Sequence, residues 1–285
     1  MEPSQSHTPG ESAVEERANV NLQQNLPALT EAYRNKFGNE ISTDNAREIV
    51  SPEYAASKEG RTQWGRATQK PASALADHLY EQGIRNPDPS RPRIVVFTSG
   101  GTGAGKTTAL RNNPDLTDGA QFMYDSNLGS KKSSVQKIDS ARNAGNQVRI
   151  IHVLRDPVQA LTGGVLPRAM DEGRVVDLDA HARMYRDSTE NIRYLARRYV
   201  NDPGVHIGIV DNRAGEAKVV PIEVVVGIRY STNDLLPKLR AALENEYAQG
   251  RISEPVYRAT LGPSSPEATG GVPRDSGPSG PPEGG

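Results

Sequence analysis

The chain of 285 residues contains no cysteine, and this absence excludes disulfide bonds, thiolate metal sites and cysteine nucleophiles. It also lacks an apolar run approaching the roughly 18 residues that a membrane-spanning helix needs, and its first residues do not show the pattern of a signal peptide. Neither sign of charge dominates, because 34 basic residues stand against 35 acidic ones, which argues against a large surface for nucleic acid or an anionic membrane. We therefore expect a cytoplasmic protein without a membrane or general nucleic-acid partner, while secretion by a route without such a signal stays open.

The most informative stretch of the chain is rich in glycine and lies between two apolar segments. Gly100, Gly105, Lys106 and Thr107 satisfy the phosphate-loop (Walker A) pattern G-x-x-x-x-G-K-[ST]. The β-branched run before this pattern predicts a buried strand, and the residues after it predict a helix. The alternative is a glycine-rich turn that binds no nucleotide, and the flanking strand and helix patterns argue against it.

The chemistry of phosphate binding explains the spacing in this loop. Glycines let the backbone curl so that its N–H groups point at phosphate oxygens. We expect Lys106 to reach the β- and γ-phosphates of ATP, and the Thr107 hydroxyl to bind Mg²⁺. The residues predicted to bind the nucleotide are Gly100, Gly101, Thr102, Gly103, Ala104, Gly105, Lys106, Thr107 and Thr108.

Composition divides the chain into four predicted regions. Residues 1–25 are polar and poor in aromatics, and we expect them to be disordered. Residues 26–88 carry short helical patterns, in which Thr43 or Asp44 can cap a helix, and they are expected to form a helical N-terminal extension. Residues 89–261 are expected to form the phosphate-loop kinase domain. Residues 262–285 consist mostly of Gly, Pro and Ser, which cannot bury enough apolar surface to offset the entropy of ordering, so a disordered tail is predicted.

After the phosphate loop, short apolar runs alternate with longer amphipathic ones. Strands are predicted at residues 121–124, 147–154 and 206–210, helices at 130–144, 157–170 and 179–199, a strand or hairpin at 219–228, and a closing helix around 235–243. This alternation predicts an α/β fold: a P-loop NTPase or kinase-like parallel sheet with helices on both faces.

Three predicted strands end in an aspartate, at Asp125, Asp156 and Asp211. Ligands of open parallel sheets collect at the carboxyl ends of the strands, so each carboxylate is a candidate for the proton-accepting base of a kinase. We favour Asp125, because it ends the first strand after the loop and small polar residues follow it. Helix capping is the alternative for Asp125, and helix capping and a turn are the alternatives for Asp156 and Asp211.

A second candidate group lies further along the chain, in a glycine-containing segment. Arg168 and Arg174 lie there six residues apart, and guanidinium groups can clamp the charge on a transferring phosphate. Each arginine alone is more simply explained as a solvated helix residue, but the glycine break in this segment and its position after the candidate base favour a function. Arg155, at a predicted strand end, is a weaker candidate for the same task.

Taken together, the loop at residues 100–107, the strand-end Asp125 and the pair Arg168 and Arg174 resemble the zeta toxin family of ATP-dependent kinases. The resemblance implies that Lys106 and Thr107 bind ATP and Mg²⁺, that Asp125 activates the acceptor hydroxyl, and that the two arginines stabilise the transferring phosphate. Members of this family phosphorylate a sugar hydroxyl of UDP-N-acetylglucosamine, and relatives act on nicotinamide dinucleotides, so a small-molecule acceptor is implied. An antitoxin-like protein that covers the ATP site is an implied partner.

The residues leave three functions open. An ATP-dependent small-molecule kinase is the leading interpretation. A polynucleotide 5′-hydroxyl kinase uses the same loop but requires a basic groove, which the balanced charge does not favour. A non-catalytic ATP-dependent binding or switch module, in which the nucleotide orders residues 163–174, predicts binding without product. The guanine-recognising sequence Asn-Lys-x-Asp is absent, and the sequence does not distinguish ATP from GTP.

Overall fold

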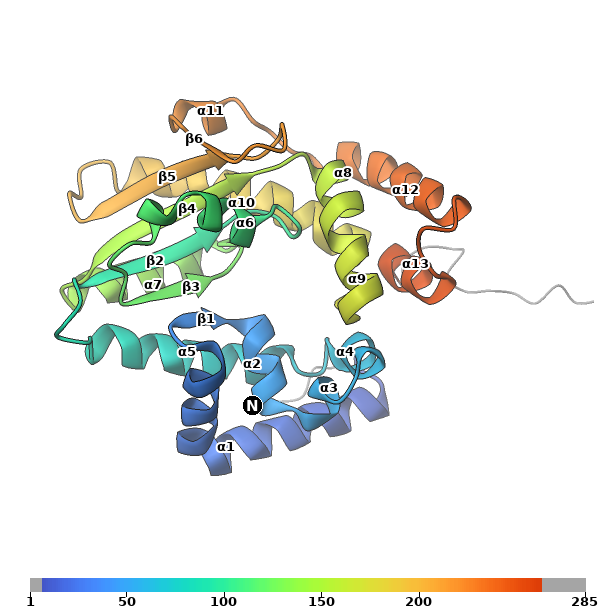
Figure 1. The fold of residues 1–285 in the computed structure, drawn as a ribbon, viewed down its shortest axis with the longest axis horizontal. Helices are drawn as coiled ribbons and strands as arrows, with labels where there is room; N and C mark the ends of the chain where they lie inside the picture. The colour runs from blue at the N-terminus through green and yellow to red at the C-terminus, as the bar shows by residue number, and fades with distance from the viewer. Residues whose placement is uncertain (1–6, 263–285) are drawn as a thin grey trace, which may run out of the picture.

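The computed structural model describes residues 7–262, in which six strands form one sheet with the order β1-β3-β2-β4-β5-β6 (Figure 1). The first five strands of this order run parallel, and β6 pairs antiparallel with β5 at the edge. The strands are β1 (Glu40–Ser42), β2 (Ile94–Ser99), β3 (Phe122–Asp125), β4 (Gln147–Leu154), β5 (Val205–Asp211) and β6 (Lys218–Val220). The predicted α/β class with a mostly parallel sheet is therefore confirmed.

Helices precede, connect and follow the strands. Those before β2 are α1 (Pro9–Phe37), α2 (Thr43–Val50), α3 (Pro52–Ala55), α4 (Lys58–Trp64) and α5 (Gln69–Arg85). Those between β2 and β5 are α6 (Lys106–Asn112), the 3₁₀ turn η1 (Pro114–Leu116), α7 (Lys131–Asn143), α8 (Pro157–Ala160), the π-helical η2 (Leu161–Val165), α9 (Leu166–Glu172) and α10 (Leu178–Arg198). The remaining ones are α11 (Glu223–Val226), α12 (Thr232–Ala248) and α13 (Glu254–Leu261).

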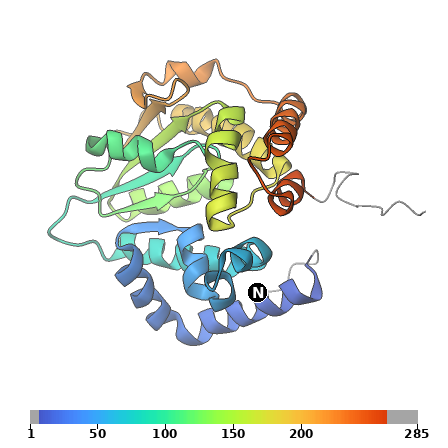
Figure 2. The same cartoon turned by 45° about the vertical axis from the view of Figure 1, so that its right-hand side comes forward.

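Alternating side chains of the central strand β2 feed two separate cores. Val95 and Phe97 belong to the larger core, which also contains buried residues of α1, α2, α5, α7 and α10. Val96 points to the other face and packs with Ala109 and Leu110 of α6. A third core joins α8, η2 and α9 to α10, α12 and α13 beside the sheet (Figure 2). Helices therefore cover both faces, as predicted.

The helical extension is joined to the sheet by a strand that the sequence did not predict. Strand β1 pairs parallel with β3, and its register places Ser42 opposite Asp125. The chain then enters α2 directly, where the Ser42 side chain accepts the N–H of Asn45 as the helix N-cap. The expected cap, Thr43 or Asp44, is therefore wrong by one or two residues.

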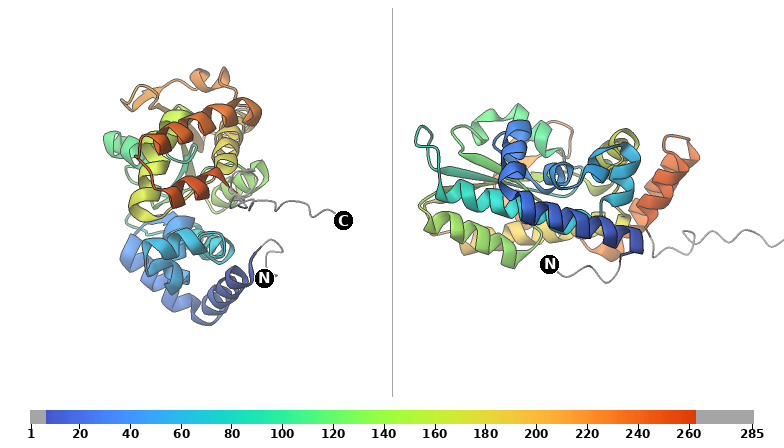
Figure 3. Two further views of the ribbon diagram at one scale, coloured as in Figure 1. Left: turned by 90° about the vertical axis from the view of Figure 1, so that its right-hand side faces the viewer. Right: turned by 90° about the horizontal axis from the view of Figure 1, so that it is seen from below.

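The predicted disorder of residues 1–25 is wrong for the part that the structure describes, because α1 begins at Pro9. Thr8 and Glu11 form a reciprocal capping box, and the proline occupies the first turn, where its missing N–H costs nothing. Helix α1 has a kink at Asn25 and lies along the outside of the extension (Figure 3). Residues 1–6 and the tail after Gly262, predicted to be disordered, lie outside the described residues.

The region predicted as a strand or hairpin at residues 219–228 is only partly a strand. Strand β6 ends at Val220, and the short helix α11 follows, in which Val225 packs into the larger core. The apolar run is too short to show whether its period is that of a strand or that of a helix, so the prediction was wrong where α11 forms. In the described part of the chain, no helix is long and apolar enough to cross a membrane.

Because the extension and the sheet share one core, we expect them to unfold together. Leu79 of α5 is fully buried in that core, and Leu79→Ala should lower the free energy of unfolding by about 2–5 kcal/mol. The chain has one tryptophan, Trp64, which lies in the extension. Urea unfolding followed by its fluorescence and by far-UV circular dichroism should give coincident transitions that shift together in the variant.

The matched control is Val200→Ala, since Val200 is 73% exposed and its truncation should change stability little. An early fluorescence transition that leaves most of the helical signal intact would show that the extension unfolds on its own.

Candidate active site

The phosphate loop has the strand, loop and helix context that the sequence predicts. It joins the buried strand β2 to α6, which begins at Lys106. Gly100, Gly103 and Gly105 have φ values of 131°, 74° and 82°, a backbone region that other residues rarely adopt. The glycines therefore permit the tight curl of the loop, and Gly105 is the N-cap of α6.

Side chains that directly follow two strands donate hydrogen bonds to the backbone of the loop. Arg155, after β4, donates from Nη1 to the carbonyl of Gly103 at 2.9 Å. Asn212, after β5, donates from Nδ2 to the carbonyl of Ala104 at 3.1 Å. Arg155, the weaker candidate for binding the transferring phosphate, thus binds the loop backbone. Asn212 also binds the loop, and the sequence analysis did not identify it.

Helix α10 and the segment η2 pack directly against the loop. The backbone of Gly101 lies so close to the ring of Tyr185 that a Cβ atom there would overlap the ring. A Cβ atom on Gly164 would lie 3.0 Å from Cα of Gly103. The helix predicted at residues 157–170 continues through the glycines of η2, and the lack of a side chain on Gly164 permits this close backbone approach.

Asp125 lies beside the loop lysine at the carboxyl end of β3. Its Oδ1 is 3.7 Å from Nζ of Lys106 and accepts a short hydrogen bond from the hydroxyl of Thr98. The Asp125 side chain is 33% exposed, so one side of the carboxylate stays open to the space above the sheet. A carboxylate held this way can accept a proton from a hydroxyl placed next to the loop.

A buried polar pair lies beneath this site. His152 of β4 is 1% exposed, and its Nδ1 lies 2.9 Å from Oγ of Ser99. Burial, with a smaller contribution from Lys106, lowers the pKa of His152 to about 3. The ring is therefore neutral near pH 7 and acts as a core residue that adds no charge next to the lysine.

A cleft of about 680 Å³ opens above the carboxyl ends of the strands. Its walls are the phosphate loop, the helical extension and the segment from η2 to α10. Charged residues that line it are Asp44, Arg47, Lys106, Asp125, Arg155, Arg168, Arg174 and Asp177. The cleft thus brings together Lys106, Asp125 and both predicted arginines.

The two arginines differ in what holds them. In the described residues no carboxylate pairs with Arg168. Arg174 pairs with Glu48 of α2 at 3.1 Å and with Glu172 at 3.3 Å. Burial alone would lower the pKa of Arg174, but nearby carboxylates, Asp44 first, outweigh it and raise that pKa. Arg168 is therefore the arginine that is more available to a ligand.

The other two strand-end aspartates are engaged locally. Asp156 accepts the N–H groups of Val158 and Gln159 and caps α8. Asp211 forms an ion pair with Arg213 and accepts its N–H. Capping and turn formation, the alternatives named for these residues, account for their contacts, whereas Asp125 faces the cleft.

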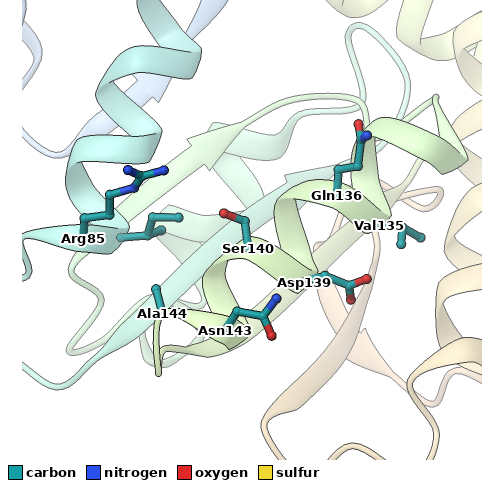
Figure 4. Close-up of a pocket in the computed structure, with 8 residues that line it drawn as sticks. Arg85, Val135, Gln136, Asp139, Ser140, Asn143 and Ala144 are labelled. Carbon is teal, nitrogen blue, oxygen red and sulfur yellow. The ribbon is translucent and has the colours of Figure 1, made fainter.

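Further hollows of the described residues include one that adjoins the loop cleft and one that is remote from it. A cavity of about 510 Å³ reaches Lys106 and Asp125 from the α6 side, and Leu110, Phe122 and Met123 are among the residues that line it. A groove of about 560 Å³ lies between α5 and α7 (Figure 4), near the helix ends that lead to the amino ends of β2 and β4. The groove is therefore remote from the phosphate loop, which follows the carboxyl end of β2.

The residues present fit ATP and Mg²⁺ by the chemistry of their donors. The loop supplies a curled backbone at the start of α6, where N–H groups have no partner within the helix. Lys106 adds a cation, and the exposed Thr107 adds a hydroxyl oxygen, a ligand type that Mg²⁺ accepts. No group of three or more His, Cys, Asp or Glu in residues 7–262 forms a metal site by itself.

The fold and the loop define a phosphate-loop protein of kinase-like class. The family model described as Zeta toxin matches residues 115–224, and this match confirms the resemblance to the zeta toxin family. It includes Asp125, Arg168 and Arg174, and it begins after the phosphate loop. A search of curated proteins gave no match.

Solved structures with a similar arrangement include two of a complex named AvrRxo1-ORF1:AvrRxo1-ORF2. The one with sulphate ions is 16% identical, covers 75% of this chain and 86% of its own, and has a TM-score of 0.40. The native one is 15% identical, covers 77% and 87%, and also has a TM-score of 0.40. A structure of the PezAT chromosomal toxin-antitoxin system of Streptococcus pneumoniae is 12% identical, covers 85% and 98%, and has a TM-score of 0.32.

The contact between Gly101 and Tyr185 predicts that the loop tolerates no side chain there. Gly101→Ala should displace the loop backbone, because the buried ring cannot move aside, and it should weaken ATP binding by about 10- to 100-fold, as expected for overpacking. Calorimetric titration with ATP and Mg²⁺ measures the effect. Gly227→Ala is the matched control, since a Cβ atom there meets nothing within 4 Å; equal affinity in both variants would contradict the prediction.

Proposed function

We propose that this protein is an ATP-dependent kinase that transfers the γ-phosphoryl group of ATP to a hydroxyl group of a small molecule. One observation carries the proposal: Asp125 and Lys106 lie 3.7 Å apart at the bottom of one cleft that arginines also line. This arrangement supports a site in which the nucleotide and the acceptor of a phosphoryl transfer would bind side by side. A UDP-sugar or a dinucleotide is the acceptor that the resemblance implies, and an antitoxin-like partner stays a prediction from that same resemblance.

The residues would divide the chemistry in the following way. ATP, when bound with Mg²⁺, supplies the phosphoryl group that is transferred. The loop N–H groups and Lys106 hold its phosphate oxygens, and the Thr107 hydroxyl binds the cation. Asp125 accepts the proton of the acceptor hydroxyl at its carboxylate, whose position the hydrogen bond from Thr98 maintains. The oxygen thus freed of its proton forms the new P–O bond as the bond to the ADP oxygen breaks.

The arginines would act on the charge of the phosphate in transfer. Arg168 lines the cleft without an ion-pair partner among the described residues. Its guanidinium can therefore turn toward negative charge that develops above the loop. Arg174 already pairs with Glu48 and Glu172, so it contributes a positive field from a fixed place.

The test is transfer of label from γ-labelled ATP with Mg²⁺ to a panel of UDP-sugars, dinucleotides and 5′-hydroxyl oligonucleotides. We expect label on one small-molecule acceptor and none with Lys106→Ala. Asp125→Asn should lower kcat by about 100- to 10,000-fold, the range for a lost general base, and should leave ATP affinity within about twofold.

Asp156→Asn is the matched control for this prediction, because asparagine also caps helices well and should keep α8 intact. Full activity of Asp125→Asn would show that another group is the base. ATP binding without transfer to any acceptor would favour the binding or switch module, and label on oligonucleotides alone would identify a polynucleotide kinase.

Removing the unpaired arginine should slow the transfer step itself. Arg168→Gln should lower kcat by about 100-fold or more and change the KM for ATP little, since loss of a group that stabilises transition-state charge costs that much. Steady-state kinetics with the acceptor found above gives both constants. Arg183→Gln is a control on the exposed face of the neighbouring helix α10; a kcat for Arg168→Gln close to this control would rule out the role.

A further inference from the structure

The helical extension contributes a wall to the loop cleft, although it lies outside the segment that matches the zeta toxin family. Ser42, Thr43, Asp44, Arg47 and Gln69 all line the cleft. The family match begins only at residue 115. These residues therefore form part of the cleft in which the phosphate loop and Asp125 also lie.

The sheet order determines which side of Asp125 the extension occupies. The phosphate loop follows β2, Asp125 ends β3, and α2 follows β1, in the order β2, β3, β1 across the sheet. Ser42 is directly opposite Asp125 in the register, and neighbouring strands lie about 4.8 Å apart. Asp125 thus lies between the loop on one side and the first turn of α2 on the other.

An acceptor hydroxyl at Asp125 leaves the rest of that molecule on the α2 side, because the loop side is taken by the nucleotide. Arg47 lies one helical turn beyond Thr43, a rise of about 6 Å along α2. It is therefore within reach of a group attached a few bonds away from the reacting hydroxyl.

Arg47 is held in a fixed orientation. Its Nη1 donates to Asp44 Oδ1 at 2.6 Å, and its Nη2 donates a short hydrogen bond to Gln69 Oε1. The guanidinium also lies 5.9 Å from the centre of the Tyr54 ring. Its Nε is buried without a hydrogen-bond partner. A guanidinium that is positioned in advance in this way loses little entropy when it binds an anion.

The charges of the cleft favour an anion at this place. Arg47 approaches the cleft from the extension, and Arg168 and Arg174 approach it from the segment between η2 and α10. Of the carboxylates in the lining, Asp44 pairs with Arg47, and Asp177 caps α10 by accepting the N–H of Ala180. Asp125 lies 3.7 Å from Nζ of Lys106 in the phosphate loop.

We propose that Arg47, held by Asp44 and Gln69, binds a phosphate group of the acceptor, so that the helical extension selects the alcohol that is phosphorylated. This inference rests on the proposed kinase function. It assigns Arg47 a specificity-determining contact with the acceptor and no part in binding ATP.

The test uses the full chain saturated with a non-hydrolysable ATP analogue and Mg²⁺, which occupies the loop. Calorimetric titrations with UDP-N-acetylglucosamine, NAD and inorganic pyrophosphate then measure binding to the remaining part of the cleft. We expect at least one of these anions to bind, and Arg47→Gln to weaken it by about 10- to 100-fold, the loss expected for charge-assisted hydrogen bonds. Affinity for the ATP analogue should not change.

Arg85→Gln is the matched control, because Arg85 also belongs to the extension and pairs with a carboxylate at 3.1 Å, but it is 73% exposed and lies at the other end of α5. Arg47→Lys should recover part of the affinity by restoring the charge without the planar fork. Gln69→Ala, which leaves the charge intact, should weaken binding about threefold and serves as the readout if Arg47→Gln lowers the melting temperature strongly.

Three results would overturn the inference: binding of the anions by Arg47→Gln as tight as by Arg85→Gln, no binding of any anion to the loaded wild-type protein, or equal loss of affinity for the ATP analogue. Failure of the kinase proposal looks different. In that case the anions bind in an Arg47-dependent manner while no acceptor takes label from γ-labelled ATP.

Discussion

The parallel pairing of β1 with β3 is the contact on which the geometry of the cleft depends. Three residues of the extension form it, and its register places Ser42 beside Asp125. Because α2 begins at the next residue, the position of the whole wall opposite the loop follows from this short ladder. Ile41, 1% exposed, adds the apolar contact that anchors the strand. Without the pairing of β1 with β3, the strands β2 and β3 would still carry the loop and Asp125. Helix α2 would then not form the opposite wall of the cleft.

A second set of contacts connects the extension to the arginine-bearing segment. Glu48 of α2 pairs with Lys36, Arg61 and Arg174. Burial would raise the pKa of Glu48, but these three cations, Lys36 first, lower it, so the carboxylate is charged at neutral pH. Thr62 also donates to the carbonyl of Gly173 at 2.9 Å. The extension therefore positions Arg174 directly, and a change in the extension would alter the field at the site without touching the loop.

Sequence patterns predicted those features that depend on neighbouring residues. The loop and its flanking strand and helix follow from a motif of eight residues, and β4 has the predicted bounds Gln147–Leu154. Strand β1 could not be predicted, because three residues acquire strand geometry only by pairing with β3, about 80 residues away in the chain. Helix α1 carried a readable capping box at Thr8, but its few apolar positions concealed it. Asn212 and Tyr185 contact the loop through the tertiary fold alone.

Two parts of the proposed activity differ in the same way, because one depends on local motifs and strand ends and the other on side chains that only the tertiary fold brings together. Phosphate binding needs backbone N–H groups, a lysine and a carboxylate at strand ends, and a parallel sheet brings these together by its topology. Recognition of an acceptor needs side chains at a distance from the reacting atoms, and no backbone geometry prescribes which residues they are. In the proposed site they come from α2 and α5, where Arg47 is held by Asp44 and Gln69. Since those helices meet the sheet through one short strand and a shared apolar core, the proposed site implies that substitutions on their cleft side would change the acceptor, whereas the loop, Asp125 and the proposed chemistry of transfer would stay the same.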